Sequence, residues 1–176
     1  MNITISKISC KEKEQLQKIG IATFTETFSE FNTEENLKKY LEASFSIEKL
    51  TSEINNTHSE FYLALDGNDP IGYLKINFGE SQTELKDNKA LEIERIYVLK
   101  EYHGKNVGQQ LYQKSLGIAK QRKVEYLWLG VWEKNERAIH FYKKNGFVIF
   151  DQHLFKLGDE EQTDFMMKLE LVHLYE

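Results

Sequence analysis

The chain has 176 residues, a length typical of one domain, and its 28 acidic and 23 basic residues give a formal net charge of −5. This charge argues against a nucleic-acid-binding protein, and the single cysteine, Cys10, excludes an internal disulfide bond and a multi-cysteine zinc site. No apolar run approaches the roughly 18 residues of a membrane-spanning helix, and the N-terminus has no signal-peptide pattern, so we expect one cytoplasmic domain over residues 1–176.

The first half of the chain combines helical spacing with a strand pair. Thr33 is a suitable helix cap, because its hydroxyl can accept a hydrogen bond from a free amide of the first turn. Pro70 ends a polar turn between two segments rich in aromatic and aliphatic residues, which predicts an antiparallel hairpin. In chain order we expect a strand near residues 3–8, helices over 11–28, from Thr33 onward and over 47–54, and strands over 60–65 and 71–76.

The second half alternates strands and helices. The run over 126–131 is apolar without interruption, which favours a central strand, and Gly146 is placed to end a helix. The sequence predicts a strand over 91–98, a helix over 108–122, a strand over 126–131, a helix over 135–145, and strands over 147–150 and 165–169. This order predicts a mixed α/β sheet built around a strand–helix–strand unit that starts at Leu91.

The loop over 102–108 connects a predicted strand to the start of a predicted helix. The first amides of a helix have no internal partner and carry the positive end of the helix dipole, so this position suits an anion. Gly104 and Gly108 allow close approach of the backbone, Lys105 adds a positive charge, and Gln109 could add a donor. The alternative is a plain turn between a strand and a helix.

The next predicted helix places three residues on one face. Asn135, Ala138 and Tyr142 are spaced i, i+3 and i+7, so a small residue lies between an amide and a phenol. Such a face would leave a slot for a thin, extended ligand. The alternative is that Ala138 and Tyr142 belong to the core while Asn135 caps the helix.

Together these two segments resemble the GCN5-related N-acetyltransferase (GNAT) family. The pattern Asn-x-x-Ala-x-x-x-Tyr, ending in Gly-Phe, is complete over 135–147, whereas His103 and Asn106 replace the usual Gln or Arg and the first motif glycine. Asn tolerates the left-handed backbone better than most residues, so the loop can keep its shape. The segments at 25–28, 32–36 and 129–135 are similar to a bacterial subgroup of spermidine/spermine acetyltransferases.

The resemblance implies an α/β fold with a mixed, mostly antiparallel central sheet, in which two parallel strands splay apart and helices flank the sheet. In this family acetyl-CoA, the co-substrate, lies in that gap, which here would separate 91–98 from 126–131. The strand edge would pair with the pantetheine arm and the loop backbone would bind the diphosphate. The cofactor-binding residues that the resemblance implies are Ile96, Tyr97, Val98, His103, Gly104, Lys105, Asn106, Val107, Gly108, Gln109, Asn135, Ala138 and Tyr142.

The chemistry that the resemblance implies is attack of an amine on a thioester. A free alkylammonium has a pKa near 10.4, so a base must take its proton before attack. Glu92 is the strand carboxylate that best matches the family, and Glu94 is the second candidate; the alternative is that both are solvated. Tyr142 corresponds to the general acid that protonates the leaving thiolate.

Two acidic segments suggest a cationic acceptor. Glu26, Glu30, Glu34 and Glu35 are the expected substrate-binding residues, and residues 159–164 hold four more acids. The resulting hypothesis is an acetyl-CoA-dependent transferase that acetylates a polyamine, with no metal, nucleic acid or membrane involved. The alternatives are another amine acceptor (a protein N-terminus, a lysine or an aminoglycoside) and a non-catalytic acyl-CoA-binding regulatory module. The resemblance also allows a homodimer.

Overall fold

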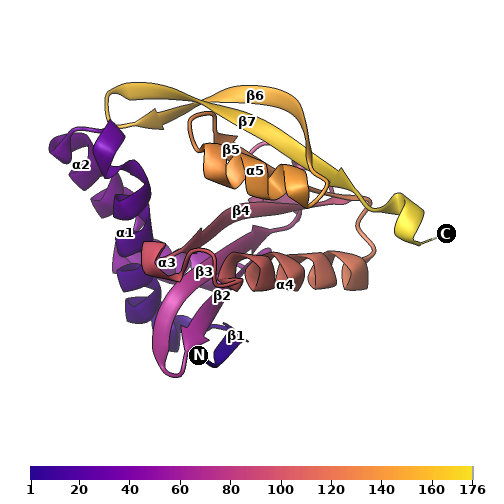
Figure 1. Ribbon diagram of the computed structural model, residues 1–176, viewed down its shortest axis with the longest axis horizontal. Helices are drawn as coiled ribbons and strands as arrows, with labels where there is room; N and C mark the ends of the chain where they lie inside the picture. Colours follow the sequence, from indigo (N-terminus) through magenta and orange to yellow (C-terminus); the bar gives the residue numbers. More distant parts are fainter. Residues whose placement is uncertain (176) are drawn as a thin grey trace.

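The computed structural model describes residues 1–175, which form a mixed sheet of seven strands in the order β1-β2-β3-β4-β5-β7-β6 (Figure 1). All neighbouring strands are antiparallel except β4 and β5, which are parallel. The strands are β1 (Ile3–Lys7), β2 (Ser59–Asp66), β3 (Asp69–Asn77), β4 (Ala90–Val98), β5 (Tyr126–Trp132), β6 (Val148–Leu157) and β7 (Glu160–Glu170). The predicted fold class is confirmed.

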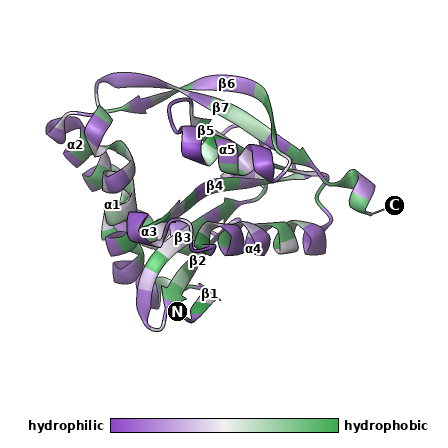
Figure 2. Cartoon of the chain, in the orientation of Figure 1, coloured by the Kyte–Doolittle hydropathy of each residue, from purple (hydrophilic) through white to green (hydrophobic). Residues whose placement is uncertain are grey.

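Five α-helices of the described chain cover the two faces of the sheet. They are α1 (Lys13–Phe28), α2 (Glu34–Ser44), α3 (Ile47–Asn55), α4 (Val107–Arg122) and α5 (Glu136–Lys144). Strand β2 shows how the faces separate: Phe61 and Leu63 pack with α1, whereas Tyr62 and Ala64 belong to the core that includes α4. Hydrophobic residues accordingly concentrate along the strands, and the outer surfaces of α4 and α5 are largely hydrophilic (Figure 2).

The sheet opens at its parallel pair. Strands β4 and β5 are in register only from Ala90 to Glu92, opposite Tyr126 to Trp128, and beyond these residues they separate. A β-bulge in β4 contributes to this divergence, because Lys75 pairs with Arg95 and Ile76 pairs with Ile93, which leaves Glu94 as an extra residue. The predicted splay between the two strands is therefore present, and the bulge places a charged residue beside it.

The predicted elements agree with the structure except at the last hairpin. Thr33 caps α2 by accepting a hydrogen bond from the amide of Asn36, as expected. Strands β6 and β7 extend to 10 and 11 residues, well beyond the predicted 147–150 and 165–169. The added residues are largely polar and partly exposed, so backbone pairing rather than hydrophobic patterning defines them. Within residues 1–175, no helix is long and apolar enough to span a membrane.

Candidate active site

Two cavities meet where β4 and β5 separate. One is a groove of about 590 Å³ beside the start of α4, and the other is a pocket of about 330 Å³ that reaches toward α1 and the hairpin β6–β7. We call them the groove and the acceptor pocket. Both are lined by the same six residues, Ile96, Tyr97, Trp132, Asn135, Ala138 and Tyr142. A ligand in the groove and a ligand in the pocket would therefore meet at this junction.

The loop before α4 presents free amides to the groove. Asn106 is the N-cap residue with a left-handed backbone (φ 65°), and its side chain makes no capping hydrogen bond. The first amides of α4 are therefore left for another acceptor. Gly104 also has a positive φ (76°), and the His103 ring shapes the loop because its Nε2 lies 2.8 Å from the carbonyl oxygen of Val98. This geometry fits a diphosphate.

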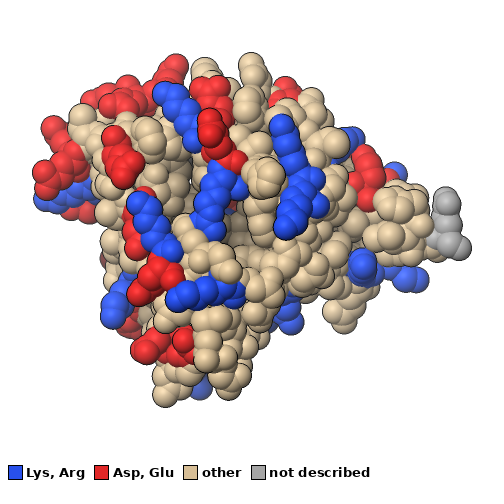
Figure 3. Space-filling view, viewed as in Figure 1, with Lys and Arg blue, Asp and Glu red and all other residues tan. Residues whose placement is uncertain are grey.

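The charges around the groove also suit an anion. Four cationic side chains line it against two carboxylates, and Lys and Arg side chains gather around the hollow in the middle of the face in Figure 3. Lys105 is not among the lining residues, and its Nζ lies 4.9 Å from the centre of the Tyr102 ring. Gln109 lines the groove, but its amide is paired with that of Asn145. The cationic lining residues are Lys100, Lys134, Arg137 and Lys144.

The Gly108→Val variant is expected to weaken acetyl-CoA binding roughly ten-fold, because the new side chain would occupy space in front of the free amides. A Cβ at Gly108 would meet only a methyl of Val98 at 3.9 Å, so the fold tolerates the change. Gly117→Val is the matched control, since Gly117 lies in the same helix, outside the groove, with nothing within 4 Å of an added Cβ. Calorimetric titration measures both, and equal affinities in the two variants would contradict a diphosphate at this loop.

Helix α5 holds two residues of the junction in a fixed geometry. The Asn135 side chain caps the helix by accepting a hydrogen bond from the Ala138 amide at 3.2 Å. Tyr142 is 5% exposed, and its ring packs edge-on against Phe141 and Phe147. Among residues 1–175 its hydroxyl has no hydrogen-bond partner, and burial raises its pKa. A phenol that keeps its proton in this way can donate it to a group in the cavity.

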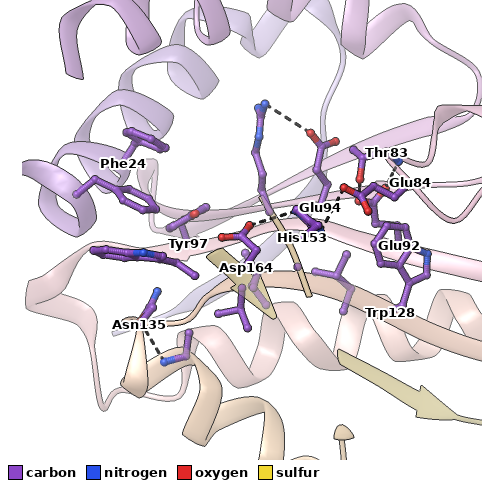
Figure 4. A pocket seen from close by; sticks show the side chains of 18 of the residues that line it. Phe24, Thr83, Glu84, Glu92, Glu94, Tyr97, Trp128, Asn135, His153 and Asp164 are labelled. Carbon is purple, nitrogen blue, oxygen red and sulfur yellow. Dashed lines mark hydrogen bonds and ion pairs between the residues drawn. The ribbon is translucent and has the colours of Figure 1, made fainter. Parts of the chain in front are cut away.

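The two strand carboxylates lie on one side of β4, but in different surroundings. The Asn77 amide donates to both Glu92 and Glu94, at 3.0 and 2.7 Å. Glu92 is 2% exposed and also accepts hydrogen bonds from the amide and hydroxyl of Thr83 (Figure 4). Burial raises the pKa of Glu92 although these hydrogen bonds oppose the rise, and the nearby charge of Glu94 adds to it. Because its pKa is raised, Glu92 takes up a proton at a higher pH than an ordinary carboxylate does.

Glu94 is held as a charged carboxylate by its neighbours. It forms ion pairs with Lys75 and, at 3.7 Å, with Arg95, and both cations also pair with Glu53 of α3. Burial would raise the pKa of Glu94, but Arg95 and Lys75 outweigh it and keep the pKa below its ordinary value. This buried network of two acids and two bases favours the ionised form of Glu94, which is therefore a poor proton acceptor.

The pocket contains a further polar group that the sequence analysis did not single out. His153 of β6 lies between two carboxylates: its Nδ1 is 3.2 Å from Glu84 Oε1, and its Nε2 is 3.7 Å from Asp164 Oδ2 (Figure 4). Burial raises the pKa of Asp164 to about 6, and the Glu84 charge adds to this rise while His153 opposes it. The cross-strand pairing of β6 with β7 places His153 beside Asp164, and the sequence gives no direct sign of that pairing.

Replacing Asp164 with asparagine is expected to stabilise the fold at pH 7. A pKa raised from the ordinary 3.8 to about 6 makes the ionised group cost up to about 3 kcal/mol above pH 6, and this cost disappears below about pH 4 because both states are then protonated. Wild-type stability should thus fall as the pH rises from about 4 to 6, and the variant should not show this loss. Urea unfolding at several pH values measures it. A less stable variant at pH 7 would contradict the assignment.

Of the four glutamates expected to bind the substrate, two line the groove and two line neither cavity. Glu26 and Glu30 line the groove, and Glu26 accepts a hydrogen bond from the Lys100 amide at 2.9 Å. Glu34 and Glu35 line neither cavity, because they occupy the exposed first turn of α2. The two acidic segments do lie side by side, since Gln162 donates to Asn32 at 3.3 Å. The acids of the acceptor pocket itself are Glu84, Glu92, Glu94 and Asp164.

Comparison with known proteins places this arrangement in a family. The sequence pattern of the acetyltransferase (GNAT) family matches residues 21–147. An uncharacterized N-acetyltransferase in the pepI 3′ region of Lactobacillus delbrueckii subsp. lactis is 39% identical over 171 residues, 97% of this chain and 98% of that protein. A spermidine N(1)-acetyltransferase of Thermoplasma acidophilum is 28% identical over 172 residues, 96% and 97% of the two chains.

A solved structure agrees with these relatives. The PaiA N-acetyltransferase of Thermoplasma acidophilum, crystallised in complex with coenzyme A, superimposes with a TM-score of 0.80 at 25% identity and covers 97% of this chain and 99% of that one. The groups lining the groove fit the acetyl-CoA that the motifs imply, and within residues 1–175 no group of acids, cysteines and histidines is arranged to hold a metal ion. The chain belongs to the GNAT family, and it is an acetyltransferase with acetyl-CoA as its co-substrate.

Proposed function

We propose that this chain acetylates a primary amine of a polyamine, with spermidine and spermine as the preferred acceptors, by direct attack of the amine on the thioester. The observation that carries the proposal is the charge of the acceptor pocket at the junction. Four carboxylates line this pocket against two cationic side chains. Glu94 and Arg95 belong to the same balanced ion network, which leaves Glu84, Glu92 and Asp164 against Lys156. A pocket with this excess of acids favours a polycation.

The pocket also has the apolar wall that an alkyl chain needs. Phe24, Phe28 and Trp132 line the pocket on the side of α1, and Phe28 and Trp132 pack with ring centres 5.3 Å apart. Methylene groups between charged nitrogens would lie against these rings. The relative from Thermoplasma acidophilum that is a spermidine N(1)-acetyltransferase supports the same acceptor class.

The residues of the junction would divide the proton transfers between them. When bound, acetyl-CoA supplies the activated acetyl group. Glu92 would take the proton of the acceptor ammonium, because its pKa is raised and it lines the acceptor pocket. Glu94 would remain ionised and hold the cation in place. Tyr142 would protonate the leaving sulfur from the groove side. Asn135 would orient the pantetheine arm of acetyl-CoA where it passes the junction.

The loop and strand edge would hold the acetyl donor. Beyond Glu92, the β5 side of β4 has no strand partner, so Ile96 to Val98 can pair with an extended chain as a further strand would. The free amides after Asn106 would bind the diphosphate. The carboxylates Glu26 and Glu30, which line the groove, and the nearby pair Glu34 and Glu35 would draw a cationic acceptor toward the junction.

A homodimer is also proposed, through the outer edge of the sheet. Strand β6 is an edge strand, and it exposes apolar side chains that include Val148 (57%) and Leu154 (66%). An exposed apolar edge of this length favours pairing with another strand. Light scattering after gel filtration would give the mass of a dimer, and the mass of a monomer at micromolar concentration would contradict the proposal.

The proposed acceptor is tested by release of free thiol from acetyl-CoA in the presence of different amines. We expect saturable turnover with spermidine and spermine, and a lower kcat/KM with a lysine-containing peptide and with an aminoglycoside. The highest kcat/KM with the peptide or the aminoglycoside would reject the polyamine and keep the acetyltransferase. Binding of acetyl-CoA without turnover for any amine would favour a regulatory module.

A further inference from the structure

The acceptor pocket has a second acidic wall, distinct from the β4 carboxylates that face the reacting amine. This wall consists of Glu84 from the loop before β4, His153 from β6 and Asp164 from β7. Figure 4 shows His153 between the two carboxylates, with Asp164 on the side toward Tyr97 and Asn135. The catalytic steps proposed above use none of these three residues.

Four buried atoms of residues that line this pocket have no hydrogen-bond partner among the described residues: Asp164 Oδ1, the Tyr73 hydroxyl oxygen, His153 Nδ1 and Arg95 Nη1. Asp164 Oδ1 is buried without a hydrogen bond, and the Asp164 side chain is only 14% exposed. The Tyr73 hydroxyl, on a residue with no exposed surface, also lines the pocket without a hydrogen bond. Buried polar atoms in native proteins are almost always paired, so this set of unpaired atoms points to a polar ligand, and the carboxylate oxygen of Asp164 calls for a donor on that ligand.

The backbone leaves space for this wall. A Cβ at Gly130 of β5 would meet His153 Cε1 at 3.3 Å and Asp164 Oδ2 at 3.6 Å. The Cβ of a larger residue would press on the imidazole, whereas it would make an ordinary contact with the carboxylate. Glycine at this position thus permits both side chains to lie over the sheet beside the junction.

Asp164 lies close to the reaction centre. It is the cross-strand partner of Trp132, which is one of the six residues of the junction. Directly opposite residues of antiparallel strands have Cα atoms about 5 Å apart. A cation at Asp164 would therefore be separated from the reacting nitrogen by a short linker.

We propose that Asp164, oriented by His153 and Glu84, is a specificity-determining residue that binds the second cationic nitrogen of the acceptor. The assignment rests on the proposed function and deepens it: the enzyme would select diamines and polyamines over monoamines by their second charge. The ammonium would donate to the Asp164 carboxylate, whose Oδ1 has no protein donor. His153 and Glu84 would keep the carboxylate in place from the far side.

Binding of two matched amines tests the proposal independently of turnover. We would titrate 1,3-diaminopropane and propylamine into the CoA-loaded protein at pH 7.5, comparing wild type, Asp164→Asn and Glu161→Gln. Glu161 is the matched control, because it is an exposed carboxylate on the same strand, paired with Lys156 and outside the pocket lining. The wild type should bind the diamine more tightly than the monoamine by roughly ten- to a hundred-fold.

The expected result is that Asp164→Asn loses most of this preference for the diamine, whereas Glu161→Gln keeps it. A structural role for Asp164 would not change the ratio of the two affinities, so the ratio separates recognition from folding. Equal preference in wild type and Asp164→Asn, or no preference in wild type, would overturn the proposal. Retained diamine preference in a protein that transfers no acetyl group would instead overturn the proposed function while supporting this site.

Discussion

Replacing Tyr142 with phenylalanine is expected to lower the turnover number by roughly 10²- to 10⁴-fold, the contribution typical of a positioned general acid. The hydroxyl is the only group lost, and the leaving thiolate would then have no proton donor at the junction. The ring contacts with Phe141 and Phe147 remain, and the hydroxyl has no partner among the described residues, so stability should change little. Steady-state rates at saturating acetyl-CoA and amine measure the effect.

The matched control for Tyr142 is Tyr112→Phe. Tyr112 is 3% exposed and packs edge-on against Phe141 in the same core, but it lines neither cavity. It should retain the wild-type rate, and both variants should keep the wild-type affinity for acetyl-CoA. A Tyr142→Phe enzyme with the wild-type turnover number would remove this residue as the acid.

Replacing Glu92 with glutamine is expected to lower the turnover number by roughly 10²-fold or more at neutral pH, because glutamine cannot accept the amine proton. A protonated carboxyl group cannot act as a base. The rate of the wild type should therefore fall as the pH decreases through the raised pKa of Glu92. Glutamine keeps the size of the side chain and can still bond to Asn77 and Thr83. The pH–rate profile of kcat measures both effects.

The companion variant Glu94→Gln distinguishes the role of Glu94 from that of Glu92. Lys75 and Arg95 keep the pKa of Glu94 low, so its removal should raise the KM for the amine. The acidic limb should remain and shift to lower pH, because the Glu94 charge no longer raises the pKa of Glu92. A Glu92→Gln variant whose loss is the same at every pH would move the base to Glu94 or to water. Refolding yields of the two variants would show whether the buried ion network survives the changes.

The sequence predicts much of this fold because its local signals agree with one another. Apolar periodicity, the Thr33 cap and the turn at Pro70 each specify an element by residues close together in the chain. The loop over 102–108 and the face of α5 are also local, and the structure brings both to one groove. The family motifs can be recognised in the sequence for the same reason, because each motif lies within one turn or one helix.

The acceptor pocket is less predictable because its residues meet only through tertiary structure. Glu84, His153 and Asp164 come from a loop and two strands that are far apart in sequence, and the register of β6 against β7 decides that two of them face each other. The bulge at Glu94 likewise gives no sign in the sequence, although the side chains of Glu94 and Arg95 form an ion pair there. A cluster of surface glutamates over 26–35 is visible in the sequence, but Glu34 and Glu35 lie outside both cavities.

The central claim is that the groove and the acceptor pocket meet at Tyr142 so that an acetyl group passes from one to the other. The most direct test is mass spectrometry of spermidine after incubation with the protein and acetyl-CoA carrying a ¹³C-labelled acetyl group. We predict a labelled monoacetylated amine that forms with wild type and is strongly reduced with Tyr142→Phe. The account would be contradicted if the wild-type protein still bound acetyl-CoA but left spermidine and all the other amines unlabelled.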